Sequence, residues 1–295
     1  MKTRLLMIVV LLCTYLNATA QMVGNVKQFA EFKKRPLVVV LPEPTGEKDK
    51  TEADRVVQTL KSKVENYWTF NKDITYMTAS EMRALKKKKK KEIKKLAVLE
   101  FSTWEITKTS SSGPFSISYT STLSVSLLED IVRNRYIYLH NFSPVFPSDG
   151  ELISAMLQVQ NIMSKSMSEG KEMSYPKEAK KNSNKLKEVT LLLDKNLLNE
   201  NITEEEIKEK YGLPYKIVDT KEIEEAIFNK AKDYAYIYIL PSGIRMHNLM
   251  IQVVLYTENS EVLAYSVPPR LRIGNSYGDK IGKGNLKDYA KYVKM

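Results

Sequence analysis

The sequence predicts an α+β fold, a two-layer α/β arrangement made of two related domains. Two observations support this prediction: short apolar runs alternate with helical segments, and the order β-α-β-α-β-β-β-α occurs twice along the 295 residues. The chain is also long enough for two cores of ordinary domain size. We therefore expect a first α/β domain over 21–167, a linker over 168–187 and a second α/β domain over 188–295.

Apolar runs and helix-capping patterns give the same series of elements in each half. In the first half the expected elements are, in order, Leu37–Leu41, a helix after Thr51, Ile74–Met77, a helix after Thr78, Leu96–Leu99, Phe115–Leu127, Tyr136–Phe142 and Glu151–Met167. In the second half they are Val189–Leu193, a helix after Thr203, Tyr215–Val218, a helix after Asp219, Tyr236–Leu240, Leu249–Tyr256, Val262–Val267 and Leu286–Val293. The best match is the second helix start, where Glu follows the cap residue by three positions, as in a capping box. We interpret the recurrence as a duplication; chance recurrence of common β-α-β elements is the alternative.

The element order also predicts how each sheet is connected. The first β-α-β unit of each half should bring two strands parallel through a right-handed crossover, and the later strands are close enough to pair as antiparallel hairpins. We expect a mixed sheet with helices mostly on one face. The segment 168–187 is rich in Lys, Glu, Ser and Asn, contains Pro176 and has no apolar period, so it is predicted to be a linker or long loop.

The first twenty residues, 1–20, are predicted to be a signal peptide. Lys2 and Arg4 precede the apolar run Leu5–Leu16, and Ala18 and Ala20 supply the small residues of a cleavage site. The run is too short to span a bilayer. An uncleaved anchor helix is the alternative.

Cleavage between Ala20 and Gln21 would give an exported protein, periplasmic or extracellular, with no transmembrane anchor. It would also remove Cys13, the only cysteine, which suits an oxidising compartment. A lipid anchor on Cys13 is disfavoured because this residue lies within the apolar run.

The composition excludes several classes of site. One Cys rules out a disulfide scaffold, and two His leave almost nothing for a histidine metal cluster or a histidine relay. We predict no catalytic residue, no cofactor-binding residue and no metal ligand. Whether the protein is an enzyme stays open, with a noncatalytic role favoured.

A basic run is the candidate contact region. Its members are Lys86, Lys87, Lys88, Lys89, Lys90 and Lys91. Such a run attracts anionic polymers, and lipid headgroups or an anionic polysaccharide fit an exported protein better than nucleic acid does. No aromatic residues alternate with the lysines to stack on bases. The alternative is a solvated end of a helix, where cations are favourable.

Three apolar patterns have both a binding and a core interpretation. In Phe115–Leu127 the even positions are Ser or Thr, which predicts a strand with one face on the core and a hydroxyl face towards water or a sugar. Tyr234, Tyr236 and Tyr238 either lie beneath a covering helix or stack on a ligand. The stripe on Glu151–Met167 faces either the core or a partner's groove.

The order of elements resembles a known architecture. The second half, with Val189–Leu193, Tyr215–Val218, Tyr236–Leu240 and Leu249–Tyr256, resembles the N-terminal α/β domain of the periplasmic Tol translocation protein and of curli-secretion lipoproteins, and the first half has the same order. The leader ending Ala18-Thr19-Ala20-Gln21 is similar to those of secreted Bacteroidota proteins. This resemblance implies noncatalytic work in envelope assembly or protein contacts, and carries over no catalytic residue.

The sequence therefore predicts an exported, noncatalytic binding or assembly protein of the cell envelope, whose partner is another envelope protein or an anionic polysaccharide. One alternative is a secreted hydrolase of glycans or peptidoglycan that uses carboxylates. The other is adhesion to an anionic surface through the lysine run.

Overall fold

The computed structural model describes residues 24–44, 46, 49–88, 95–110, 113–131, 136–142, 144–241, 250–267 and 278–293. The predicted signal peptide lies outside these ranges. Within them, no helix combines the length and the apolarity that crossing a bilayer requires.

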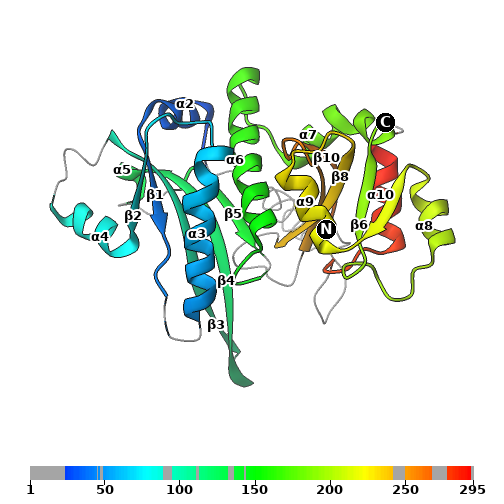
Figure 1. The fold of residues 1–295 in the computed structure, drawn as a ribbon, viewed down its shortest axis with the longest axis horizontal. Coiled ribbons are helices and arrows are strands. Elements are labelled where there is room, and N and C mark those ends of the chain that lie inside the picture. Colours follow the sequence, from blue (N-terminus) through cyan, green and yellow to red (C-terminus); the bar gives the residue numbers. More distant parts are fainter. Residues whose placement is uncertain are drawn as a thin grey trace, which may run out of the picture.

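The predicted α+β fold is confirmed, with two five-stranded mixed sheets (Figure 1). The first sheet has the order β2 (Ile74–Thr78), β1 (Leu37–Leu41), β3 (Ala97–Ser110), β4 (Gly113–Leu127) and β5 (Tyr138–Phe142). The second has the order β7 (Tyr215–Val218), β6 (Thr190–Asp194), β8 (Tyr234–Pro241), β9 (Met250–Tyr256) and β10 (Val262–Ser266). In both sheets the second strand of this order, β1 or β6, pairs parallel with its two neighbours, and the last two pairings are antiparallel. The chain thus has two similar halves.

The helices cover corresponding faces in the two halves. They are α2 (Val26–Lys34), α3 (Lys50–Tyr67), α4 (Ala79–Lys88), α5 (Leu128–Ile131), α6 (Asp149–Glu169), α7 (Tyr175–Asn182), the 3₁₀ helix η4 (Ser183–Lys187), α8 (Glu204–Tyr211), α9 (Thr220–Phe228) and α10 (Lys283–Tyr292). In the first half α3 and α6 pack on one face of the sheet and α4 on the other. In the second half α8 and α10 share a face, and α9 covers the opposite one. Both faces of each sheet therefore carry helices, so the prediction that helices lie mostly on one face is wrong.

Capping boxes explain where two helices begin, whereas Asp219, the predicted cap of α9, makes no side-chain capping hydrogen bond. At α4 the Thr78 hydroxyl accepts from the Glu81 backbone N–H, and the Glu81 carboxylate accepts from the Thr78 N–H at 2.7 Å. Thr203 and Glu206 form the same reciprocal pair at α8. These bonds satisfy backbone N–H groups that the first turn of a helix leaves without partners.

Helix α6 belongs to the cores of both halves. It stands between the two sheets (Figure 1) and packs against α2 and α3 on one side and α9 on the other. Its fully buried residues, including Leu152, Met156 and Met163, join one hydrophobic cluster that contains side chains of both sheets. The apolar stripe therefore faces the core, and the groove that it fills lies between the two halves of its own chain.

The segment 168–187, predicted to be a linker, is mostly helical. Tyr175, Ala179 and Leu186 are buried in α7 and η4, and α7 packs against β10. The prediction missed this because few apolar residues anchor the segment. Glu178, a charged residue, supplies part of the buried surface through an ion pair with Lys165.

The tyrosine stripe of β8 lies beneath a helix, as expected. Tyr236 and Tyr238 are buried, and the Tyr236 hydroxyl donates to Ser154 of α6. The hydroxyl face of β4 differs from its prediction, because Thr122, Ser124 and Ser126 are at most 2% exposed. Thr122 donates to the side chain of Asn141 and Ser124 to the Glu100 carbonyl, so protein groups replace the expected water at these two positions. The Ser126 hydroxyl has no hydrogen-bond partner among the described residues.

Candidate functional site

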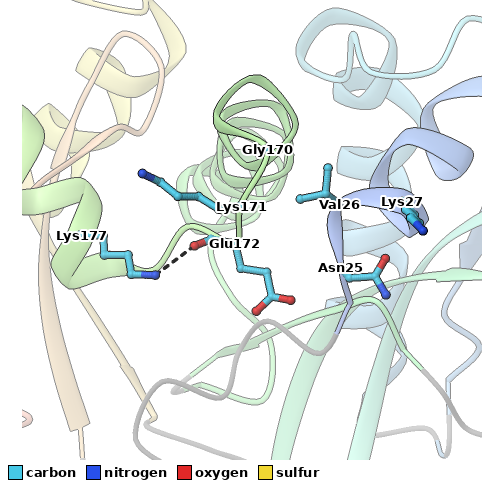
Figure 2. Close-up of a pocket in the computed structure, with 7 residues that line it drawn as sticks. All are labelled: Asn25, Val26, Lys27, Gly170, Lys171, Glu172 and Lys177. Carbon is cyan, nitrogen blue, oxygen red and sulfur yellow. Dashed lines mark hydrogen bonds between the residues drawn. The ribbon is translucent and has the colours of Figure 1, made fainter.

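A shallow depression of about 530 Å³ lies where the first turn of α2 meets the end of α6 and the start of α7 (Figure 2). Its lining residues are Asn25, Val26, Lys27, Gly170, Lys171, Glu172 and Lys177. Gly170 ends α6 in the left-handed conformation, with φ 65°, which glycine adopts without strain. The chain then turns across the depression towards α7.

The charges of the depression do not converge on one point. Lys177 donates to the Glu172 backbone carbonyl at 3.3 Å, and Lys171 lies 3.5 Å from the Glu169 carboxylate. Figure 2 shows the ammonium groups of Lys27 and Lys171 pointing in opposite directions. The Asn25 side chain is used as the cap of α2. The depression thus carries positive charge without a fixed arrangement of donors around a ligand.

Three acidic residues gather at the start of α6. Burial raises the pKa of Glu151, and Glu224 raises it further. The Glu151 carboxylate accepts from the Ser148 N–H at 2.8 Å, and Glu224 accepts from the Gly150 N–H at 3.2 Å. Asp149 lies 2.6 Å from the Arg55 guanidinium. Each acid has a structural partner at a buried helix terminus, so their proximity is explained by capping.

His140 is fully buried and cannot exchange protons with a substrate at the surface. Its Nε2 lies 3.1 Å from the Tyr238 hydroxyl, and burial lowers its pKa to about 3. The ring is therefore neutral at pH 7 and belongs to the contact between β5 and β8. Within the described part of the chain, no group of His, Cys, Asp and Glu could hold a metal ion.

The lysine run is only partly described. Lys86 is half-buried, and its pKa is lowered by burial, although the nearby Glu100 carboxylate opposes this shift. Lys87 is exposed near the end of α4, Lys88 is the last residue of that helix, and Lys89, Lys90 and Lys91 lie outside the described residues. Anion contact by this run stays a prediction.

The most distinctive surface feature is a two-stranded extension of the first sheet. β3 pairs with β1 only through Glu100, and β4 pairs with β5 only from Ser121 onwards. Beyond these points, 103–110 and 113–120 pair only with each other among the described residues. We call these two stretches the β-arm; it projects past the rest of the first sheet in Figure 1.

Proline placement explains why β1 and β5 do not continue alongside the β-arm. Pro42 directly follows β1, and proline cannot donate a ladder hydrogen bond. After β5 the chain turns at Pro144, whose carbonyl accepts from Ser121 at 3.1 Å. The neighbours thus have 5 residues each, whereas β3 has 14 and β4 has 15.

The sequence prediction missed most of the β-arm. It ended the third strand at Leu99, but β3 continues to Ser110. The available signal was length, since the alternation in Phe115–Leu127 is far longer than Leu37–Leu41 or Tyr136–Phe142. A strand that outruns its neighbours must extend beyond their sheet.

Comparison with known proteins adds no assignment to this geometry: the chain matches no protein-family model, no curated protein and no solved structure.

Proposed function

We propose that this protein is an exported, noncatalytic binding or assembly protein of the cell envelope, and that it contacts its partner through the β-arm. The observation that carries the proposal is the outer edge of 113–120 beside 103–110, which pairs with no other strand in the part of the chain that the structure describes. The partner class is a protein that can add an extended strand.

The physical reason lies in the backbone of the arm. Along each outer edge, alternate N–H and C=O groups point away from the hairpin with no partner strand among the described residues. A hairpin of two strands is only marginally stable by itself in water, and an open edge is a template for a further strand. Strand addition would stabilise the arm and would give the partner main-chain hydrogen bonds.

Export is proposed from the leader. Lys2, Arg4 and the apolar run Leu5–Leu16 precede the small residues of a cleavage site. Removal of 1–20 would leave a chain without cysteine. The resemblance to the Tol and curli-secretion domains stays a prediction; it agrees with a role in contacts between envelope proteins. We also infer that the two similar halves arose by duplication.

The hydrolase alternative is not favoured by the three acids at the start of α6. A glycoside hydrolase needs two carboxyl groups facing a substrate cleft. Glu151, Glu224 and Asp149 instead bind the first turn of α6 or Arg55, away from the residues that line the depression.

The test places one charge on the arm. The test variant is Ser118→Lys, in the β4 stretch of the β-arm. The control is Ser164→Lys, the same substitution at an exposed position of α6. We expect the native protein to migrate in an envelope complex on a native gel, the Ser118→Lys variant to lose that complex and the Ser164→Lys variant to keep it. N-terminal sequencing should give Gln21. An intact Met1 on a cytosolic protein, or a complex unchanged by Ser118→Lys, would overturn the proposal.

A further inference from the structure

We propose that the partner strand of the β-arm is β4 of a second copy of this chain, paired antiparallel about a twofold axis. The two first sheets would then form one continuous sheet across the molecular boundary. This inference rests on the proposed binding role of the arm and names the partner.

The two outer edges of the arm differ in charge. The β3 edge, 103–110, carries Glu105 and Lys108, whereas the β4 edge, 113–120, has no charged residue. Charged residues on a free edge oppose strand addition, which is how proteins protect such edges. The β3 edge carries this protection within its length, whereas on the β4 edge the one protective residue is Pro114 at the outer end. The stretch 115–120 of β4 is therefore the edge suited to pairing.

The β4 edge also suits pairing with itself. A twofold axis brings the same strand opposite itself, so any charge on the strand would face a like charge nearby. None is present in 113–120. The register places Phe115, Ile117 and Tyr119 on one face of β4, and the Ser or Thr positions on the other.

With a twofold axis perpendicular to the sheet, the same face of β4 lies on the same side of the joined sheet in both copies. Apolar positions would then lie opposite apolar positions, and hydroxyl positions opposite hydroxyl positions. Aromatic, β-branched and Ser/Thr cross-strand pairs of this kind each stabilise a sheet modestly.

The neighbouring strand β5 ends at the inner end of this edge. Thr120 donates to the Phe142 carbonyl, the last residue of β5, and Ser121 donates to the Pro144 carbonyl. Because the chain turns away there, no described strand follows β4 further out. The stretch 115–120, which excludes Pro114, is about 20 Å long at the rise of an antiparallel strand, which accommodates an additional strand of ordinary length.

The first experiment introduces a positive or a negative charge at Ser118 on the β4 edge. We expect the native chain to be a dimer by light scattering. Ser118→Lys and Ser118→Glu should each weaken dimerisation at least tenfold at low salt, because like charges then lie on the same face of the paired strands. An equimolar mixture of the two variants should recover the dimer. Ser164→Lys and Ser164→Glu are the matched controls on α6 and should leave it unchanged; circular dichroism checks that every variant is folded.

The second experiment measures which strand lies at the axis. In a Cys13→Ser background, Ser118→Cys is compared with Ile106→Cys, which occupies the paired position on β3. Strands lie about 4.8 Å apart, so two β3 strands would be about 14 Å apart across the axis. We expect mild oxidation to link Ser118→Cys dimers and not Ile106→Cys dimers. Equal linking at both positions would overturn the proposed pairing.

The outcomes separate this inference from the proposed function. A monomeric native chain whose envelope complex is nevertheless lost in Ser118→Lys would overturn the second copy as partner and leave the binding role standing. Recovery of the dimer in the mixture supports the inference. A dimer that persists in both single variants, or a mixture that stays monomeric, would overturn it.

Discussion

Lys165 of α6 lies 2.8 Å from the Glu178 carboxylate of α7 and 2.7 Å from the Glu261 carboxylate before β10. The Glu178 side chain is fully buried, and its carboxylate also accepts from the Val262 N–H. One ammonium group therefore joins the central helix to the helical segment and to the edge strand of the second sheet.

Removing that ammonium should destabilise the fold strongly. Lys165→Met leaves the buried Glu178 carboxylate without its cation, and we expect a loss of about 3 kcal/mol in the free energy of unfolding at pH 7. Denaturant titration measures it. The control is Lys181→Met, which breaks the exposed pair with Glu169 and should cost less than about 1 kcal/mol. Equal losses in the two variants would contradict the role assigned to Lys165.

The buried histidine should make the protein less stable in acid. Burial lowers the pKa of His140 to about 3, against 6.5 for an exposed ring. The stability that the neutral His140 ring gives the folded chain is therefore fully present above pH 6.5. It declines as the pH falls from 6.5 towards 3, because in that range the unfolded chain takes up a proton on this ring and the folded chain does not. At pH 5 the loss from this group is about 2 kcal/mol.

His140→Gln provides the measurement, since Gln can keep a hydrogen bond to the Tyr238 hydroxyl. We expect the free energy of unfolding of the native chain to fall relative to this variant between pH 7 and pH 5. Burial raises the pKa of Glu151 and of Glu178, which acts in the opposite direction in both proteins and cancels in the comparison. Parallel pH curves would show that His140 is not the titrating group.

The order of the elements could be predicted from local patterns. Runs such as Leu37–Leu41 and Val189–Leu193 correspond to β1 and β6, which each have two parallel neighbours, and capping pairs such as Thr203 with Glu206 mark helix starts. These signals depend on residues that are close in sequence. They are therefore visible without the fold.

The features that the sequence patterns missed depend on contacts between residues far apart in the sequence. Nothing near Glu178 in the sequence indicates that Lys165 and Glu261 neutralise it, so 168–187 was predicted to be a linker. The hydroxyls of β4 were expected to face water, but Asn141 and the Glu100 carbonyl supply their hydrogen bonds. The β-arm follows from where β1 and β5 end relative to β3 and β4, which is a property of the assembled sheet.

The close contact between Gly24 and Ile137 predicts that adding one methyl group at Gly24 destabilises the fold. A Cβ on Gly24 would lie 2.8 Å from the Ile137 Cβ and 2.9 Å from its carbonyl oxygen, and the Gly24 N–H already donates to that carbonyl. We expect Gly24→Ala to cost about 1–3 kcal/mol. Gly284→Ala in α10 has open space around it and should be neutral or stabilise by up to about 1 kcal/mol. Thermal melts compare the two.

The shared position of α6 predicts that the halves unfold together. Met156 is fully buried in the cluster that contains side chains of both sheets, and the Tyr67 hydroxyl of α3 donates to the Phe228 carbonyl of α9 at 2.8 Å. Met156→Ala should cost about 2–5 kcal/mol. Because α6 completes both cores, amide hydrogen exchange should show the same loss of protection in β1 of the first half and β8 of the second. Loss confined to β1 would mean that the second half is stable without α6, and that the two sheets are separate folding units.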